Sequence, residues 1–327
     1  MTDLYALLSQ TGAFKTVNGD KLNGRLSHAY LILTADEQNL TEYLKIFARL
    51  MVCESDGACA KCRACKLIEQ NANPDVYYYP RGNESITSEE VNDLIEESYL
   101  KPIECDKKIF VLDKAQTMNA SAQNKLLKTL EEPPKNVHIL IGATSEFPLL
   151  STVKSRVKKL EIAPFNKEQL FDALKGDCLD EQRLKIAIAC SDGTVGNATA
   201  LYNDQNLKEL TDVALDVLTQ LQSSKDVLKY SLTIANGKWD VGDFISVLEL
   251  LLRDLLAYSQ GESQVVFNTV NLDKLKTAKN FSTGSIIHAL EKVNEAQKRK
   301  KFNANSTMLI EWLLFQILEG KYKWQKL

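Results

Sequence analysis

Four of the seven cysteines lie in one short stretch with the spacing of a metal site. Cys53, Cys59, Cys62 and Cys65 follow the pattern Cys-x5-Cys-x2-Cys-x2-Cys, with no histidine nearby. Four thiolates complete a tetrahedral shell around Zn²⁺, and two-residue gaps let neighbouring sulfur atoms converge from one turn. The spacing therefore predicts a structural zinc site. The alternative is a set of free thiols.

A second candidate is the apolar run KIFVLD at residues 108–113, which ends in an acid. An apolar strand followed by an aspartate is the arrangement in which Asp113 would help to hold Mg²⁺ in a nucleotide-hydrolysing protein. A hydrolytic site normally has a second acid next, and this chain has Lys114 there. The alternative is a strand that simply ends in a polar residue.

A third stretch, residues 28–50, is informative for what it lacks. A strand-like run leads through a short turn into an amphipathic helix, the place for a glycine-rich phosphate loop. No glycine stands between Gly24 and Gly57. With the phosphate-loop pattern set on Thr34 to Thr41, Leu40 stands at the lysine position and Thr41 at the Mg²⁺-binding hydroxyl.

The same turn carries the wrong charge for a phosphate. Asp36 and Glu37 add negative charge where phosphates would approach. Backbone N–H groups need glycine to wrap a phosphate closely. Flexible backbone, positive charge and a second acid are thus all missing, and we expect no ATP hydrolysis by this chain.

These candidate residues need a scaffold, and residues 29–162 alternate between strand-like and helix-like segments. Short, apolar, often β-branched strands buried on both faces, with helices between them, indicate a mostly parallel α/β sheet. Thr87 and Glu90 form the pattern of a capping box, and Pro133 stops the helix before it. The predicted strands are 29–33, 75–79, 108–112, 137–143 and 158–162, and the predicted helices are 40–52, 88–99 and 120–130.

After Pro164 the pattern changes to helix upon helix. A compact helical set, 165–205, precedes a bundle of longer helices, 206–327, so we expect three domains, the first being 1–164. The predicted helices are 167–174, 181–191, 196–202, 207–221, 241–258, 285–300 and 307–318.

Composition excludes some classes of protein. The chain has 327 residues, is 44% hydrophobic and carries a net charge of −3. This charge argues against strong autonomous nucleic-acid binding. No apolar run approaches the roughly 18 residues of a membrane span, and the N-terminus shows no signal pattern, so we expect a cytoplasmic protein.

Several longer stretches carry a resemblance to a known family. They include AQTMNASAQNKLLKTLEEPP (115–134), HILIGATSEFPLLSTVKSRV (138–157), GRLSHAYLIL (24–33) and FNANSTMLIEWLL (302–314). Together with the cysteine cluster at 53–65, they resemble the clamp-loader branch of the AAA+ ATPases. The resemblance implies a P-loop-like AAA+ domain with a zinc insertion, a small helical lid and an all-α collar.

Within this resemblance, Ser155 and Arg156 match the family's arginine-finger motif, although Val157 stands where the family has Cys. The resemblance implies that Arg156 reaches a neighbouring subunit's nucleotide and stabilises charge on its γ-phosphate. The alternative is a surface arginine that pairs with a local acid.

The resemblance also implies partners. They are ATP-hydrolysing gamma or tau subunits, a delta subunit and, through the complex, the sliding clamp and primed DNA, with no membrane. The chain would then be a non-hydrolysing subunit of a DNA-directed DNA polymerase (nucleotidyltransferase) holoenzyme. Two alternatives remain: a divergent but active gamma- or tau-like ATPase, and a zinc-dependent interaction module that keeps an AAA+ shell.

Two other groups of charged or titratable residues receive structural interpretations. The basic run 298–301 is interpreted as a solvated helix end rather than a phosphate contact. His28 and His138 flank strand starts, and we expect both to be structural.

Overall fold

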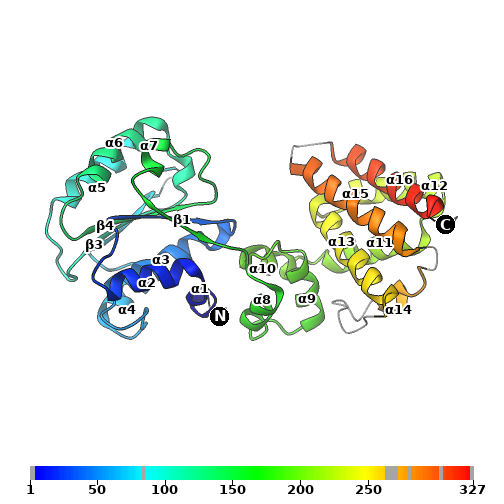
Figure 1. Ribbon diagram of the computed structural model, residues 1–327, viewed down its shortest axis with the longest axis horizontal. Helices are drawn as coiled ribbons and strands as arrows, with labels where there is room; N and C mark the ends of the chain where they lie inside the picture. The colour runs from blue at the N-terminus through cyan, green and yellow to red at the C-terminus, as the bar shows by residue number, and fades with distance from the viewer. Residues whose placement is uncertain (1–3, 83–84, 262–271, 279–280, 302–304, 325–327) are drawn as a thin grey trace. The chain divides into compact units, whose positions relative to one another are not determined.

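The computed structural model describes residues 4–82, 85–261, 272–278, 281–301 and 305–324 (Figure 1). The first three residues of the stretch 302–314 lie outside the described residues. The chain divides into two compact units, Met1–Ala173 with Thr194–Gly196, and Leu174–Gly193 with Asn197–Leu327. The division into three domains stays a prediction.

A five-stranded parallel sheet forms the centre of the first unit, as the alternation of segments predicts. The strand order is β2-β3-β4-β1-β5, and all four neighbouring pairs are parallel. The carboxyl ends of all five strands therefore lie at one edge of the sheet. The strands are β1 (Ala29–Thr34), β2 (Val76–Tyr79), β3 (Lys108–Leu112), β4 (Val137–Ala143) and β5 (Lys158–Ile162).

Three details of the predicted strands are wrong. β1 runs one residue further than predicted, to Thr34. β2 begins at Val76 rather than Asp75, because the buried Asp75 carboxylate accepts the backbone N–H groups of residues 103–105. β5 is not buried on both faces, because it lies at the edge of the sheet and most of its residues are at least partly exposed.

Helices cover both faces of this sheet (Figure 1). One face carries α1 (Leu4–Ser9), α2 (Gly12–Leu22), α3 (Leu40–Val52) and α4 (Arg63–Glu69). The other carries α5 (Ser88–Ser98), α6 (Ala120–Glu131) and α7 (Ser151–Lys154). Two 3₁₀ turns, η1 (Glu37–Asn39) and η2 (Ala115–Thr117), precede α3 and α6, and α8 (Lys167–Leu174) follows β5.

Close packing of α3 against the sheet depends on a glycine. A Cβ atom at Gly142 on β4 would lie 2.5 Å from Leu44 Cδ1 and 3.0 Å from Leu40 Cδ1. The side chains of Leu40, Leu44 and Phe47 are fully buried. Burial of such a side chain contributes about 1.5–3 kcal/mol, so this contact fixes the start of α3 against β4.

The predicted capping box on the opposite face is confirmed, and the structure adds a second cap at Asn119. Thr87 Oγ1 accepts the N–H of Glu90, and Glu90 Oε2 accepts the N–H of Thr87. Asn119 Oδ1 accepts the N–H of Ala122 at the start of α6. Both caps satisfy N–H groups that a helix start leaves unpaired.

The second unit is helical. Its largest core cluster gathers leucine, isoleucine and valine side chains around α13, which packs against α11 and α15. Among the described residues, no helix is both long and apolar enough to cross a membrane. The helices are α9 (Glu181–Ala189), α10 (Val195–Asn203, whose first two residues belong to the first unit), α11 (Leu207–Gln220), α12 (Ser224–Ala235), α13 (Val241–Ser259), α14 (Leu272–Leu275), α15 (Thr283–Lys301) and α16 (Ser306–Lys323).

Candidate functional site

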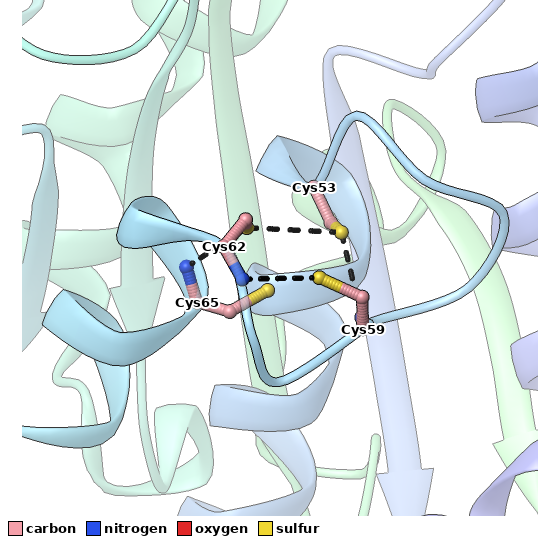
Figure 2. Close-up of side chains that lie close together, drawn as sticks. All are labelled: Cys53, Cys59, Cys62 and Cys65. Atoms are coloured by element: carbon pink, nitrogen blue, oxygen red, sulfur yellow. Dashed lines mark hydrogen bonds between the residues drawn. The ribbon is translucent and has the colours of Figure 1, made fainter.

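The four cysteines predicted as metal ligands converge in the structure (Figure 2). Cys53 follows the end of α3, Cys59 lies in the loop, Cys62 caps α4 and Cys65 lies in its first turn. Their Sγ atoms all lie within 4.8 Å of one another. Tetrahedral Zn–S bonds of about 2.3 Å require S···S separations of roughly 3.8 Å, so a small adjustment would close the shell.

Backbone N–H groups point at these sulfur atoms. The N–H groups of Cys59, Cys62 and Cys65 donate to the Sγ atoms of Cys53, Cys59 and Cys62 at 3.3–3.4 Å. Donors from the backbone of Cys62 and Lys61 lower the pKa of the Cys59 thiol to about 6. Burial raises the pKa of the Cys65 thiol because it disfavours the thiolate, and a metal ion bound by the four cysteines would offset that cost. The four cysteines could therefore hold a metal ion such as zinc.

Residues from α1 and α2 hold the cysteine loop, and sequence reasoning missed them. Asn18 Oδ1 accepts the N–H of Gly57, and Lys21 Nζ donates to the Gly57 carbonyl. Tyr5 OH accepts the N–H of Ala58 and lies 2.6 Å from where a Gly57 Cβ would stand. Gly57 has φ +75°, which suits glycine. No local motif pairs positions so distant in sequence.

At the loop after β1, the structure places Leu40 in the core. The Leu40 side chain is fully buried beneath the sheet. Thr34 at the end of β1 is also buried, and its Oγ1 accepts the N–H of Asp36. A lysine aimed at a phosphate would need to point away from the sheet, so an apolar residue here anchors the helix instead.

The structure brings Thr41 and Asp113 together across 72 residues of sequence. Thr41 Oγ1 donates to Asp113 Oδ2, while Asp113 Oδ1 is buried and has no hydrogen-bond partner among the described residues. The following residue, Lys114, has a left-handed backbone with φ +52° and pairs with Glu37 at 3.2 Å. The Thr41 hydroxyl and the Asp113 carboxylate are thus adjacent, but the residue after Asp113 is a lysine that pairs with Glu37.

Arg156 lies just after α7, and its guanidinium is engaged within the chain. Nη2 pairs with Glu131 Oε1 at 2.6 Å, and Nη1 donates to the Thr152 carbonyl at 2.8 Å and to Ser155 Oγ at 3.2 Å. The Arg156 side chain keeps 34% of its surface exposed. The local acid of the structural alternative is therefore present, and the arginine is still reachable from outside.

Arg156 and the loop after β1 lie at opposite edges of the sheet. The Arg156 carbonyl contacts His28 Nε2 at 3.0 Å, directly before β1, and β5 begins two residues after it. Asp113 and Thr41 lie beyond the carboxyl ends of the strands. The six residues of β1 separate the two edges by roughly 16 Å at about 3.3 Å per residue.

His138 and two residues of the basic run 298–301 have local partners, as their structural interpretations predict. His138 Nδ1 contacts the Ser27 carbonyl at 2.8 Å, and burial lowers the pKa of His138. In the basic run, Arg299 pairs with Glu295 and stacks over Trp312, and Lys300 pairs with Asp240. These local partners support the helix-end interpretation over a phosphate contact.

Comparison with known proteins gives consistent matches. Residues 9–166 match the family model described as DNA polymerase III, delta subunit. The delta′ subunit of Bacillus subtilis DNA polymerase III is 26% identical over 313 residues, covering 90% of this chain and 92% of that protein. The gamma subunit of Buchnera aphidicola subsp. Schizaphis graminum is 23% identical over 343 residues, covering 95% and 94%.

A solved structure, a gamma subunit-related protein of Thermotoga maritima, covers 94% of this chain and 99% of its own at 17% identity, with a TM-score of 0.44. On the family and sequence matches, the chain is similar to the clamp-loader subunits of DNA polymerase III. The family model and the delta′ match support a delta-prime-like subunit.

Proposed function

We propose that this chain is a non-hydrolysing clamp-loader subunit of the delta-prime type, and that it supplies Arg156 to the nucleotide site of a neighbouring ATPase subunit. The observation that carries the proposal is the position of Arg156. It is partly exposed at the sheet edge opposite the chain's own loop after β1. An arginine there is too far from its own loop, so the phosphate it serves belongs to another subunit.

The chain's own loop supports the non-hydrolysing half of the proposal. Leu40 is buried where a cation is needed, and Lys114 stands where a second acid would position water. Phosphoryl transfer depends on groups that neutralise the developing charge and orient the nucleophile. This loop offers neither group, so hydrolysis falls to the partner subunits.

The finger itself is built from Arg156 and the groups that hold it. Glu131 and the Thr152 carbonyl keep the guanidinium in a defined orientation in the isolated chain. A planar guanidinium can present two parallel N–H groups to phosphate oxygens. Contact with the neighbour's γ-phosphate would then replace the exposed ion pair with Glu131, which costs little to break.

The proposed partners are gamma- or tau-type ATPase subunits and a delta subunit, as in the clamp loaders of its relatives. The helical second unit would serve as the lid and the collar that assembles with them. Through the complex, the chain would help to open the sliding clamp and place it on primed DNA. Its net charge of −3 is consistent with a role in which DNA is bound by the assembly rather than by this chain alone.

The experiment is ATP turnover by the reconstituted complex. Arg156→Ala should lower the kcat of the complex by the share of turnover that its one site carries, while leaving assembly intact, since the finger is worth about 10³ or more at that site. Arg63→Ala removes an exposed arginine paired with Glu104 in the same unit and is the matched control. Unchanged turnover with Arg156→Ala would refute the finger.

The zinc ion of the cysteine cluster would be structural. All four sulfur atoms would be ligands, which leaves no open position for a substrate. The bound ion would tie the end of α3 to the start of α4 through Cys53 and Cys65.

One observation favours a second function, a divergent but active gamma- or tau-like ATPase. Thr41 and Asp113 still form the hydroxyl–carboxylate pair that a Mg²⁺ site uses, and one oxygen of Asp113 is unpartnered among the described residues. ATP turnover by the purified chain that is lost with Asp113→Asn would support this function over the first.

A further inference from the structure

Asp36 is buried although it lies in the turn after β1 and its neighbour Glu37 is exposed. Only 3% of Asp36 is accessible. Its carboxylate accepts the Tyr43 hydroxyl at 2.9 Å and the Asn39 amide at 3.1 Å. A buried carboxylate is tolerated when donors satisfy its oxygen atoms, so these two contacts are the first part of its environment.

The other donors come from a distant part of the same unit. The backbone N–H of Val195 donates to Asp36 Oδ2 at 3.0 Å, and the N–H of Gly196 reaches Oδ2 at 3.2 Å and Oδ1 at 3.3 Å. Val195 and Gly196 are the first two residues of α10. The start of a helix leaves N–H groups unpaired and carries partial positive charge, which favours an anion there.

The turn at Asp36 and the start of α10 approach so closely that only glycine fits at position 196. A Cβ atom at Gly196 would lie 2.6 Å from Asp36 Oδ1 and 2.7 Å from Gln38 Cβ. Any other residue at this position would push the turn and the helix start apart. The φ angle of Gly196 is not in the left-handed region, so the glycine serves close approach rather than backbone conformation.

We infer that Asp36 is a built-in anion that clasps the start of α10 to the turn after β1, so that the donors gathered there are satisfied by the chain itself. Four donor groups, from Asn39, Tyr43, Val195 and Gly196, converge on one carboxylate. An incoming phosphate would have to displace that carboxylate, or bring a second negative charge against it. The clasp therefore holds this turn closed without a nucleotide.

This inference deepens the non-hydrolysing role proposed above and rests on it for its meaning in the complex. The clasp itself is a property of the isolated chain. The experiment therefore uses the full chain alone, without ATP or partner subunits. Its result is independent of Arg156 and of turnover by the complex, so either proposal can fail while the other stands.

The test measures backbone amide exchange at Val195 and Gly196. Asp36→Ala and Asp36→Asn should each speed exchange of these two amides at least about tenfold, because both remove the anionic acceptor. Glu37→Gln is the matched control, because it removes a neighbouring carboxylate that pairs with Lys114 outside the clasp. It should leave both amides unchanged. Wild-type exchange rates at both amides in the Asp36 variants would overturn the inference.

A rescue experiment identifies the missing group as an anion. Sodium formate should slow exchange of the Val195 and Gly196 amides in Asp36→Ala, whereas sodium chloride at the same ionic strength should not. Equal effects of the two salts would overturn the assignment of a carboxylate site. In the wild-type chain, which needs no variant to fold, millimolar pyrophosphate should leave both amides unperturbed. A perturbation there would contradict the clasp.

Discussion

At the residue scale, a few side chains determine what this chain can do with a nucleotide. Leu40 anchors α3 in the core, and Lys114 pairs with Glu37 beside the carboxylate of Asp113. Neither Leu40 nor Lys114 disturbs the fold, because an apolar residue suits the buried position 40 and an ion pair suits the surface at position 114. The proposed loss of hydrolytic machinery would thus be compatible with an intact parallel sheet.

A different acid in the helical unit gives a pH-dependent prediction. Asp243 lines a cavity of about 440 Å³ together with Asp192, Asp204 and Lys300. Burial raises the pKa of Asp243 from 3.8 to about 6, the carboxylates of Asp240 and Asp204 add to the rise, and Lys300 opposes it. Between these two values the folded chain binds more protons than the unfolded chain. Stability should therefore fall as the pH rises through this window.

Asp243→Asn removes this dependence. At about pH 7.5 it should raise the free energy of unfolding of the helical unit by roughly 1–2 kcal/mol, and at about pH 4.5 the gain should be smaller. Chemical denaturation at both pH values measures the difference. Asp212→Asn, an exposed carboxylate paired with Lys274, is the control and should show no such gain. Equal gains at both pH values would contradict the assignment.

At the element scale, α6 positions the proposed finger from both sides. Near its start, buried Gln123 donates to the Pro148 carbonyl and accepts the N–H of Leu150, which holds the segment before α7. At its end, Glu131 pairs with Arg156 after α7. One helix therefore fixes both ends of the short α7 segment, and a local sequence pattern identifies neither contact.

The element that joins α3 to α4 should depend on zinc. Metal analysis of the purified chain should find about one zinc per chain, and Cys65→Ser should lose it, because a structural site needs all four ligands. Removing the metal with a chelator should lower the unfolding temperature of the first unit. Cys178→Ser lies outside the cluster and should retain the ion. No zinc in a reducing, chelator-free preparation would refute the site.

At the scale of the whole molecule, the two candidate nucleotide-related groups face different edges of one sheet. The carboxyl edge carries Thr41 and Asp113, and the amino edge carries Arg156. In a ring of similar subunits, this arrangement would let each subunit contribute to two nucleotide sites, its own and that of the neighbouring subunit. In the proposed complex, this chain contributes only to the site of its neighbour.

The whole chain is therefore expected to bind Mg-ATP weakly or not at all. The clasp of Asp36 and the missing cation at Leu40 both act against a bound phosphate. Calorimetric titration of the purified chain with Mg-ATP should show no tight binding. A dissociation constant near micromolar, about −8 kcal/mol, would require more favourable contacts than this turn offers and would overturn the expectation.

The sequence by itself determined several features that rest on local pattern. Apolar runs predicted the parallel strands, the helix bounds Leu40–Val52 and Lys167–Leu174 are confirmed, and the cysteine spacing predicted a cluster that closes in the structure. These features depend on periodicity, capping and short loops, which neighbouring residues encode. By contrast, no pattern identified α1 and α2, because α1 spans only six residues and the apolar residues of α2 follow no clear helical period.

Only the tertiary structure decided which distant groups meet. It brought Asn18 and Lys21 to the cysteine loop, and it brought Asp36 to the start of α10 across 159 residues. It also separated Arg156 from Asp113, although both lie within the residues that match the family model. The physical reason is that parallel strands return the chain to the same edge only after a crossover helix, so proximity in space depends on strand order rather than on sequence distance.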